Sequence, residues 1–333
     1  MTDKVANETE LIQTYLAPLA AGFPGAFGLT DDCALIAGDA SHDLVVTTDP
    51  IVAGVHFFAQ DRPGDIAWKA LAVNVSDLIA KGAEPFAYTM ALAFPEAPGH
   101  AWMATFADGL KAAQLMFGCH LIGGDTDCTS GPLSISITVF GRVPAGAFVK
   151  RSGAREGDHV FVTGTVGDSA LGLDIHRRAA AFDSHLSSED RSFLVGRYLR
   201  PAPHIEMAPI VRAFASAALD ISDGLVKDLE RLARHVPARI EVRSDTLPLS
   251  LPARKALIAD PARIASIISG GDDYEILFSV SPGRLEEFRN AMRAVPVQVT
   301  EIGTLERGSG VCVLDAAGAR LDQGLTGYDH FSP

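Results

Sequence analysis

The sequence has few cysteines, and it lacks any long apolar run. Its 333 residues include four scattered cysteines, with no CxxC pair among them: Cys33, Cys119, Cys128 and Cys312. Neither a disulfide framework nor a zinc site is expected, and the thiols are predicted to be reduced, as in the cytoplasm. No stretch of about 18 apolar residues is present, so no membrane span is expected. Residues 1–10 also lack the basic start and apolar centre of a signal peptide.

Positive charge is also scarce. The formal net charge is −13, which argues against nucleic acid or an anionic membrane as the main partner. It leaves an anionic nucleotide possible, because bound Mg²⁺ reverses the local sign. The GxxxxGK[ST] phosphate loop and the Rossmann glycine fingerprint are both missing. A phosphate site in this chain must therefore be built in another way.

The most informative residue type is aspartate, because it recurs in short clusters along the chain. Nine aspartates fall in six short clusters, several rich in glycine or small polar residues: 30–34, 47–49, 74–77, 123–126, 220–224 and 270–275. Converging carboxylates repel one another unless cations neutralise them. Mg²⁺ binds carboxylate oxygens while keeping waters and substrate phosphates. A single such aspartate is more often a cap or turn residue, but the six clusters together predict a magnesium–polyphosphate site and an ATP-using enzyme.

Hydrophobic periodicity predicts strands and helices in both halves. The apolar stripe of 65–81 predicts a helix with Asp65 as N-cap, and Tyr274–Val280 reads as a strand. Such mixed elements indicate α/β and α+β layers. A boundary near residues 145–155 gives two domains, 1–149 and 150–333.

Several residues have both a functional and a structural interpretation. Asp77 lies on the polar face of its helix, as a metal ligand or as a solvated carboxylate paired with Lys81. Arg151 is either a phosphate clamp or a solvated loop cation. His56, beside aromatic residues, is either a binding residue or a structural histidine.

Eight segments, taken together and in order, resemble the thiamine-monophosphate kinase family: Thr30–Ala34, Thr47–Asp49 with Gly54–Phe57, Ala72–Asp77, Leu121–Thr126, Arg151–Ala154, Asp220–Leu225, Ser269–Glu275 and Gly327–Phe331. The resemblance covers nearly the whole chain. It implies the two-domain fold of aminoimidazole ribonucleotide synthetase, with an N-terminal ATP- and magnesium-binding domain and a C-terminal α+β domain that completes the active site. It also implies a homodimer formed through the N-terminal domains.

The reaction implied by the resemblance is phosphorylation of thiamine monophosphate to thiamine diphosphate, with ATP as co-substrate and Mg²⁺ as cofactor. The resemblance assigns the metal to Asp32, Thr47, Thr48, Asp49, Asp77, Asp125, Asp220 and Asp223. It assigns ATP contacts to Gly124, Asp125, Arg151 and Ser222, and substrate contacts to His56, Asp272 and Tyr328. Among these, Asp77, Asp125 and Arg151 are predicted to be catalytic.

Two positions depart from the family pattern. Thr30 stands where a glycine is usual, and Asp272 stands where the usual residue is glutamate, one methylene longer. Three other interpretations remain open from the sequence: another ATP-dependent synthetase of the superfamily, a non-catalytic ATP- or metal-binding maturation factor, and a calcium-stabilised domain. The last lacks the loop spacing of an EF-hand.

Overall fold

A computed structural model describes residues 4–5, 7–30, 33–177, 184–234, 236–325 and 327–328. The chain divides into two units, the first comprising Met1–Leu78 and Ala83–Gly146, and the second Ile79–Gly82 and Ala147–Pro333. Residues 147–149, which the sequence placed in the first domain, thus group with the second unit.

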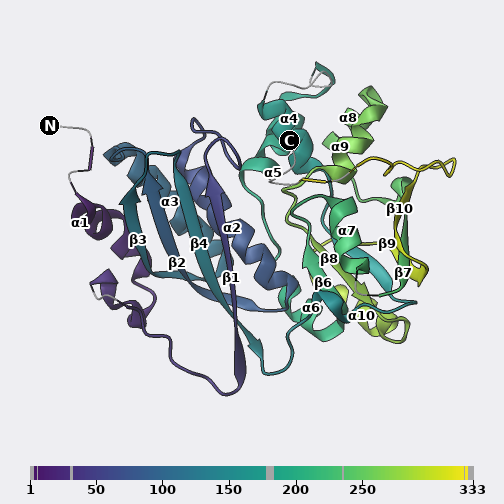
Figure 1. Cartoon of the computed structure of the whole chain (residues 1–333), viewed down its shortest axis with the longest axis horizontal. Coiled ribbons are helices and arrows are strands. Elements are labelled where there is room, and N and C mark those ends of the chain that lie inside the picture. The colour runs from purple at the N-terminus through teal and green to yellow at the C-terminus, as the bar shows by residue number, and fades with distance from the viewer. Residues whose placement is uncertain are drawn as a thin grey trace. The chain divides into compact units, whose positions relative to one another are not determined.

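The first unit contains a mixed sheet of strand order β1-β4-β2-β3, in which only β2 and β3 are parallel. Helices α2 and α3 cover one face of this sheet (Figure 1). Short helical segments precede β1: α1 (Glu8–Leu11), then Ile12–Leu16, Ala17–Ala20 and Pro24–Leu29. The remaining elements are β1 (His42–Val52), α2 (Pro63–Ala80), β2 (Glu84–Phe94), α3 (His100–Phe117), β3 (His120–Cys128) and β4 (Ser134–Pro144).

Helix α2 begins two residues earlier than predicted. Pro63 opens the helix, and Asp65 lies in its first turn. Asp65 was expected to be the N-cap, and that expectation was wrong. Proline suits the first helical position because its missing N–H has no partner there, and the carboxylate of Asp65 still interacts favourably with the helix dipole.

The second unit contains a larger sheet of order β10-β7-β9-β5-β8-β6, in which only β10 and β7 are parallel. Its strands are β5 (His159–Thr163), β6 (Ala215–Asp220), β7 (Ala238–Arg243), β8 (Ile276–Val280), β9 (Val299–Arg307) and β10 (Gly310–Leu314). Its helices are α4 (Asp168–His176), α5 (Ser188–Leu199), α6 (Met207–Phe214), α7 (Leu225–Ala233), α8 (Leu251–Ala259), α9 (Ile264–Ser269) and α10 (Leu285–Met292).

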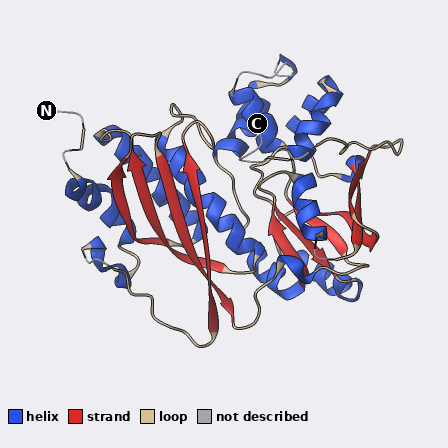
Figure 2. Cartoon of the chain, viewed as in Figure 1, coloured by secondary structure: helices blue, strands red, loops and turns tan. Residues whose placement is uncertain are grey.

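The strands β5 and β8 are buried on both faces, whereas β7 alternates buried and exposed residues, and helices flank the sheet (Figure 2). Phe161 and Phe278 stack with ring centroids 5.7 Å apart and both contact Phe288 of α10. The alternate residues Val160 and Leu277 join the core on the other face. The combination of α/β and α+β layers is therefore confirmed.

Two further sequence expectations concern cysteines and membranes. The structure has all four cysteines as free thiols, and burial raises the pKa of Cys119 to about 12. Within the described ranges, no helix combines the length and the apolar character that crossing a membrane requires.

Candidate active site

Three of the predicted metal-binding residues meet where β1 passes α2. Thr47 Oγ1 donates to Asp77 Oδ2 at 2.7 Å. Asp49, two residues along the strand from Thr47, faces the same side of the sheet. Its amide donates to Asn74 Oδ1 at 2.8 Å, and the buried Asn74 amide donates to the Ala70 carbonyl at 3.1 Å. Asn74 therefore fixes the register of β1 against α2, a role that sequence reasoning missed.

Thr48 points the other way. Successive side chains of a strand alternate between the faces of the sheet. The Thr48 hydroxyl donates to the Ile137 carbonyl at 3.1 Å and accepts from the Thr138 hydroxyl at 3.0 Å. The hydroxyls of Thr47 and Thr48 thus lie on opposite faces, and only that of Thr47 is beside Asp77.

Gly124 and Asp125 lie on β3, at the opposite edge of the sheet from β1. The strand register places Asp49, Ile137, Met90 and Gly124 in one cross-strand row. Three strand spacings separate the ends of this row, roughly 14 Å. Gly124 has to be glycine, because a Cβ there would lie 1.9 Å from the Met90 carbonyl oxygen. The backbones of β2 and β3 therefore approach each other very closely at this position.

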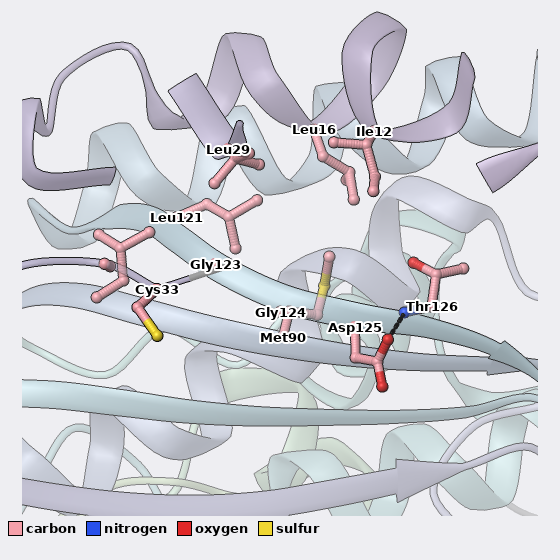
Figure 3. A pocket seen from close by; sticks show the side chains of 12 residues that line it. Ile12, Leu16, Leu29, Cys33, Met90, Leu121, Gly123, Gly124, Asp125 and Thr126 are labelled. Atoms are coloured by element: carbon pink, nitrogen blue, oxygen red, sulfur yellow. Dashed lines mark hydrogen bonds between the residues drawn. The ribbon is translucent and has the colours of Figure 1, made fainter. Parts of the chain in front are cut away.

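A cavity of about 290 Å³ opens beside Gly124 (Figure 3). Its apolar side is formed by Ile12, Leu16 and Leu29 from the N-terminal helical segments. Its polar end carries Asp125, whose Oδ1 accepts from the Thr126 amide at 2.9 Å. The cavity therefore combines an apolar wall with a few polar groups at one end, as is typical of small-molecule binding sites.

His56 lies in the tight turn after β1. Its Nδ1 accepts from the Val52 amide at 3.1 Å, and Lys69 Nζ donates to its carbonyl at 3.0 Å. With Nδ1 acting as acceptor, the neutral imidazole carries its proton on Nε2. The ring is therefore both structurally anchored and a possible donor.

In the second unit, the segment after β6 is joined to the segment between α9 and β8. The Asp272 amide donates to the Ser222 carbonyl at 3.0 Å, and the Tyr274 amide donates to the Ile221 carbonyl at 2.9 Å. Gly271 makes this approach possible, since a Cβ there would lie 2.2 Å from the Ser222 oxygen. The segments that carry Ser222, predicted to bind ATP, and Asp272, predicted to bind substrate, are thereby brought together.

Tyr328 joins the same cluster. Its amide donates to the Asp223 carbonyl at 3.0 Å, and its carbonyl accepts from Lys227 Nζ. Lys227 Nζ is also 3.0 Å from Asp223 Oδ2. The C-terminal segment is thus held against the segment after β6. The rest of the expected terminal motif, residues 329–331, lies outside the described residues.

Asp228 supports the backbone of the predicted site, and the sequence analysis missed it. It is completely buried in α7 and accepts from the amides of Ser222 and Asp223, each at 3.1 Å. Arg231 donates to Asp228 at 2.7 Å and also to Asp223. Burial, only partly offset by Arg231, raises the pKa of Asp228 to about 6. Its place on the apolar stripe of α7 was the available signal, because carboxylates are rarely buried without partners.

A second buried set of charges lies behind the 270–275 segment. Glu275 is 2 % exposed and accepts from Arg197 Nη2 at 2.6 Å and from Thr163 Oγ1 at 2.6 Å. His204 Nε2 is 3.4 Å from the same carboxylate. Burial alone raises the pKa of Glu275, but His204 and Arg197 outweigh it and hold that pKa below its usual value. Reciprocally, the bond to Glu275 raises the pKa of His204.

The remaining predicted residues are not gathered into one metal site. Arg151 begins a single 3₁₀ turn (Arg151–Gly153) in the second unit and is exposed. Asp32 lies outside the described residues. Among the residues that the structure describes, no group of three or more His, Cys, Asp or Glu residues is arranged to hold a metal ion. The oxygen-only donors at Thr47, Asp49 and Asp77 nevertheless match the preference of a hard cation such as Mg²⁺.

Comparison with known proteins places this architecture in a class. The family model of the AIR synthase related protein N-terminal domain matches residues 30–143, and that of the C-terminal domain matches residues 155–315. The two matches correspond to the two sheets and their helices. The two-domain AIR synthase-like fold predicted from the sequence is therefore confirmed.

Individual relatives are more specific. The thiamine-monophosphate kinase of Caulobacter vibrioides is 40% identical over 308 residues, covering 92% of this chain and 86% of that protein. A crystal structure of thiamine-monophosphate kinase from Stenotrophomonas maltophilia K279a has a TM-score of 0.78 at 40% identity, covering 86% of this chain and 89% of that one. AaThiL complexed with AMPPCP and TMP has a TM-score of 0.77 at 34% identity, with 89% of each chain covered. The chain belongs to the thiamine-monophosphate kinase family.

Proposed function

We propose that this protein is a kinase that transfers the γ-phosphoryl group of ATP to thiamine monophosphate, giving ADP and thiamine diphosphate. The observation that carries the proposal is the convergence in the second unit of Ser222, Asp223, Asp272 and Tyr328, residues that the family resemblance assigns to ATP, metal and substrate. A relative solved with AMPPCP and TMP supports the same pair of ligands.

The nucleotide is proposed to use the cavity beside β3. Ile12, Leu16 and Leu29 offer an apolar wall for an adenine ring. Gly124, at the polar end of the cavity, is the proposed backbone contact for the phosphates, because glycine permits close approach to its main chain. In the second unit, the family resemblance assigns Arg151 to ATP, and a guanidinium can bind phosphate oxygens in a bidentate manner.

The acidic residues are proposed to bind Mg²⁺, and the oxygen donors present fit that ion. Asp49 and Asp77 are proposed to hold one ion in the first unit. The family resemblance also assigns metal to Asp32 and Asp125 of the first unit and to Asp220 and Asp223 of the second, as ligands of further ions. When bound, Mg²⁺ offsets the negative charge that accumulates between two phosphates. The chain's own part is orientation: Thr47 fixes one oxygen of Asp77, and Asn74 fixes the backbone of Asp49.

No general base is needed in this proposal. The acceptor is a phosphate monoester with a second pKa of about 6, so it is largely dianionic at neutral pH. Direct in-line transfer then depends on positioning and electrostatic stabilisation. His56 supports positioning, because its Nε2–H can donate to an anionic substrate while its Nδ1 is held by Val52.

We also propose a cytoplasmic homodimer. The face of the first sheet opposite α2 and α3 exposes Leu44 and Val46, which are 53% and 51% exposed. Val46 pairs in register with Phe140 of β4, so the apolar side chains extend across two strands. A second copy of this chain is the proposed cover. Sedimentation velocity tests it: a dimer is expected for the natural chain and a monomer for V46E, and a natural chain that sediments as a monomer contradicts it.

The proposed reaction is tested by measuring ADP release from Mg²⁺–ATP with thiamine monophosphate, thiamine and other phosphomonoesters. Turnover only with thiamine monophosphate, with thiamine diphosphate as product, is the expected result. ATP binding without turnover on that substrate would overturn the proposal and favour a superfamily relative or a binding protein.

A further inference from the structure

The segment between α9 and β8 has an unusual backbone. Asp272 has φ of +70° and Tyr274 has φ of +51°, although neither is glycine. A non-glycine residue in the left-handed region is disfavoured on the order of 1 kcal/mol or more, so the surrounding structure has to maintain it. Residues held in this way cluster at ligand-binding sites. The conformation also explains why β8 starts at Ile276, whereas the sequence had predicted a strand from Tyr274.

Buried anchors alternate with partly exposed side chains along this segment. Asp273 is 1% exposed and accepts from the Gly167 amide at 2.6 Å and the Ser169 amide at 3.2 Å, at the start of α4. Glu275, two residues on, is held in the Arg197 network described above. Both acids point inward and are fully engaged in bonds within the protein. They are therefore anchors rather than ligand-binding groups.

The side chains of Asp272 and Tyr274 face each other instead. The Tyr274 hydroxyl donates to Asp272 Oδ1 at 3.0 Å. Both side chains are partly exposed. A hydroxyl that binds one oxygen of a carboxylate restricts the rotation of that carboxylate. Hydrogen bonds to an ionised acceptor are also stronger than those between neutral groups.

We propose that Tyr274 is a positioning residue for thiamine monophosphate, acting through Asp272. This inference rests on the proposed function, in which Asp272 contacts the substrate. The Asp273 and Glu275 anchors impose the left-handed backbone that turns Tyr274 and Asp272 toward each other. Tyr274 then holds the shorter carboxylate of Asp272 in one orientation for the cationic part of the substrate. Asp272, held by Tyr274, thereby serves where the family usually has a glutamate.

The test uses Y274F, which removes one oxygen atom and keeps the ring. The KM for thiamine monophosphate is expected to rise on the order of tenfold, as for a lost hydrogen bond to a charged group. The KM for ATP and the kcat are expected to stay within about twofold of their values in the natural chain. The thermal midpoint is expected to stay within about 2 °C. The matched control is Y15F, which loses the bond between Tyr15 and His100 in the first unit and is expected to leave both KM values unchanged.

A double-mutant cycle separates positioning from a structural role. In an Asp272→Ala background, Y274F is expected to have no further effect on the KM or on the Kd for thiamine monophosphate measured by calorimetry. An equal rise in both backgrounds, an unchanged KM in Y274F alone, or a joint rise of both KM values with a lower thermal midpoint would overturn the inference. The proposed function stands in those cases, provided the natural chain phosphorylates thiamine monophosphate. A natural chain that neither binds nor phosphorylates it would overturn both.

Discussion

In the first unit, Asp77 accepts from a threonine hydroxyl and Asp125 from a backbone amide, whereas in the second unit Asp223, Asp228 and Glu275 are each bound by an arginine. Within the described part of the chain, no Lys, Arg or His forms an ion pair with Asp77 or Asp125. Carboxylates without a protein cation are available to cations from outside, while paired carboxylates are already neutralised.

The comparison indicates a division of labour. The acids of the first unit are suited to bind metal ions, and most acids of the second unit hold loops in shape. Asp223 lies between the two cases, because Lys227 and Arg231 both reach Oδ2 of this residue, which is predicted to bind metal. The following predictions separate the two roles, beginning with the largest expected effect.

Breaking the buried ion pair between Arg197 and Glu275 is expected to cost the most stability. R197M removes the guanidinium but leaves Glu275 buried, and an uncompensated buried charge costs about 3–5 kcal/mol. Urea denaturation measures this loss. The control is R239M, whose exposed pair with Glu241 is expected to contribute less than about 1 kcal/mol. Equal losses in the two variants would show that Glu275 is not held by its partner as described.

Removing a carboxylate from the first unit is expected to lower the rate of the reaction rather than the stability of the fold. Asp77→Ala should lower kcat by at least about 100-fold, comparable with loss of one electrostatic group in an active site. The magnesium dependence should change, while the unfolding transition stays near that of the natural chain. Initial rates of ADP release across a range of Mg²⁺ concentrations measure it. Near-normal turnover with unchanged magnesium dependence would refute the assignment of Asp77.

The hydroxyl that orients Asp77 is expected to have a smaller effect. T47V keeps the shape of the side chain and removes its bond to Asp77, which should lower kcat/KM at limiting Mg²⁺ by about tenfold. The control T105V removes a hydroxyl that binds only the Ala101 carbonyl within α3, and normal kinetics are expected. If T47V and T105V behave alike, the Thr47 bond has no part in orienting the carboxylate.

The stability of the fold should depend on pH through the buried carboxyl group of Asp273. Burial, reinforced by Asp168, raises the pKa of Asp273 to about 8, whereas the unfolded chain releases that proton near pH 4. This group therefore stabilises the fold fully below about pH 4, and its contribution falls as the pH rises to about 8, by at most about 1.4 kcal/mol per pH unit. In D273N that slope is expected to disappear. Denaturation at several pH values tests it, and parallel curves for the two proteins would contradict it.

Much of this site was accessible from the sequence, since the glycine- and aspartate-rich segments are local patterns. Ser222, Asp223, Asp272 and Tyr328 were predicted to act together, and the structure brings their segments into contact. Local patterns were enough at these positions because turn chemistry and alternation act over a few residues.

Other features depend on partners far away in the sequence. Arg197 is 78 residues from Glu275, so nothing near either residue indicated their pairing. The strand register that separates Asp49 from Asp125 across the sheet is likewise a tertiary property. The left-handed conformation of Asp272 and Tyr274 was missed because neither is glycine, and the buried anchors that impose it are visible only in the fold.

The most direct test measures activity and stability in parallel on two isosteric variants, one from each unit. D77N should lose most of its thiamine-monophosphate kinase activity and keep its unfolding free energy. Glu275→Gln should lose about 2 kcal/mol or more of unfolding free energy, since the buried Arg197 loses its charged partner, while its kcat under conditions where it is folded stays close to normal. The reverse pattern, with activity lost in the second variant and stability lost in the first, would contradict the division of roles between the two units.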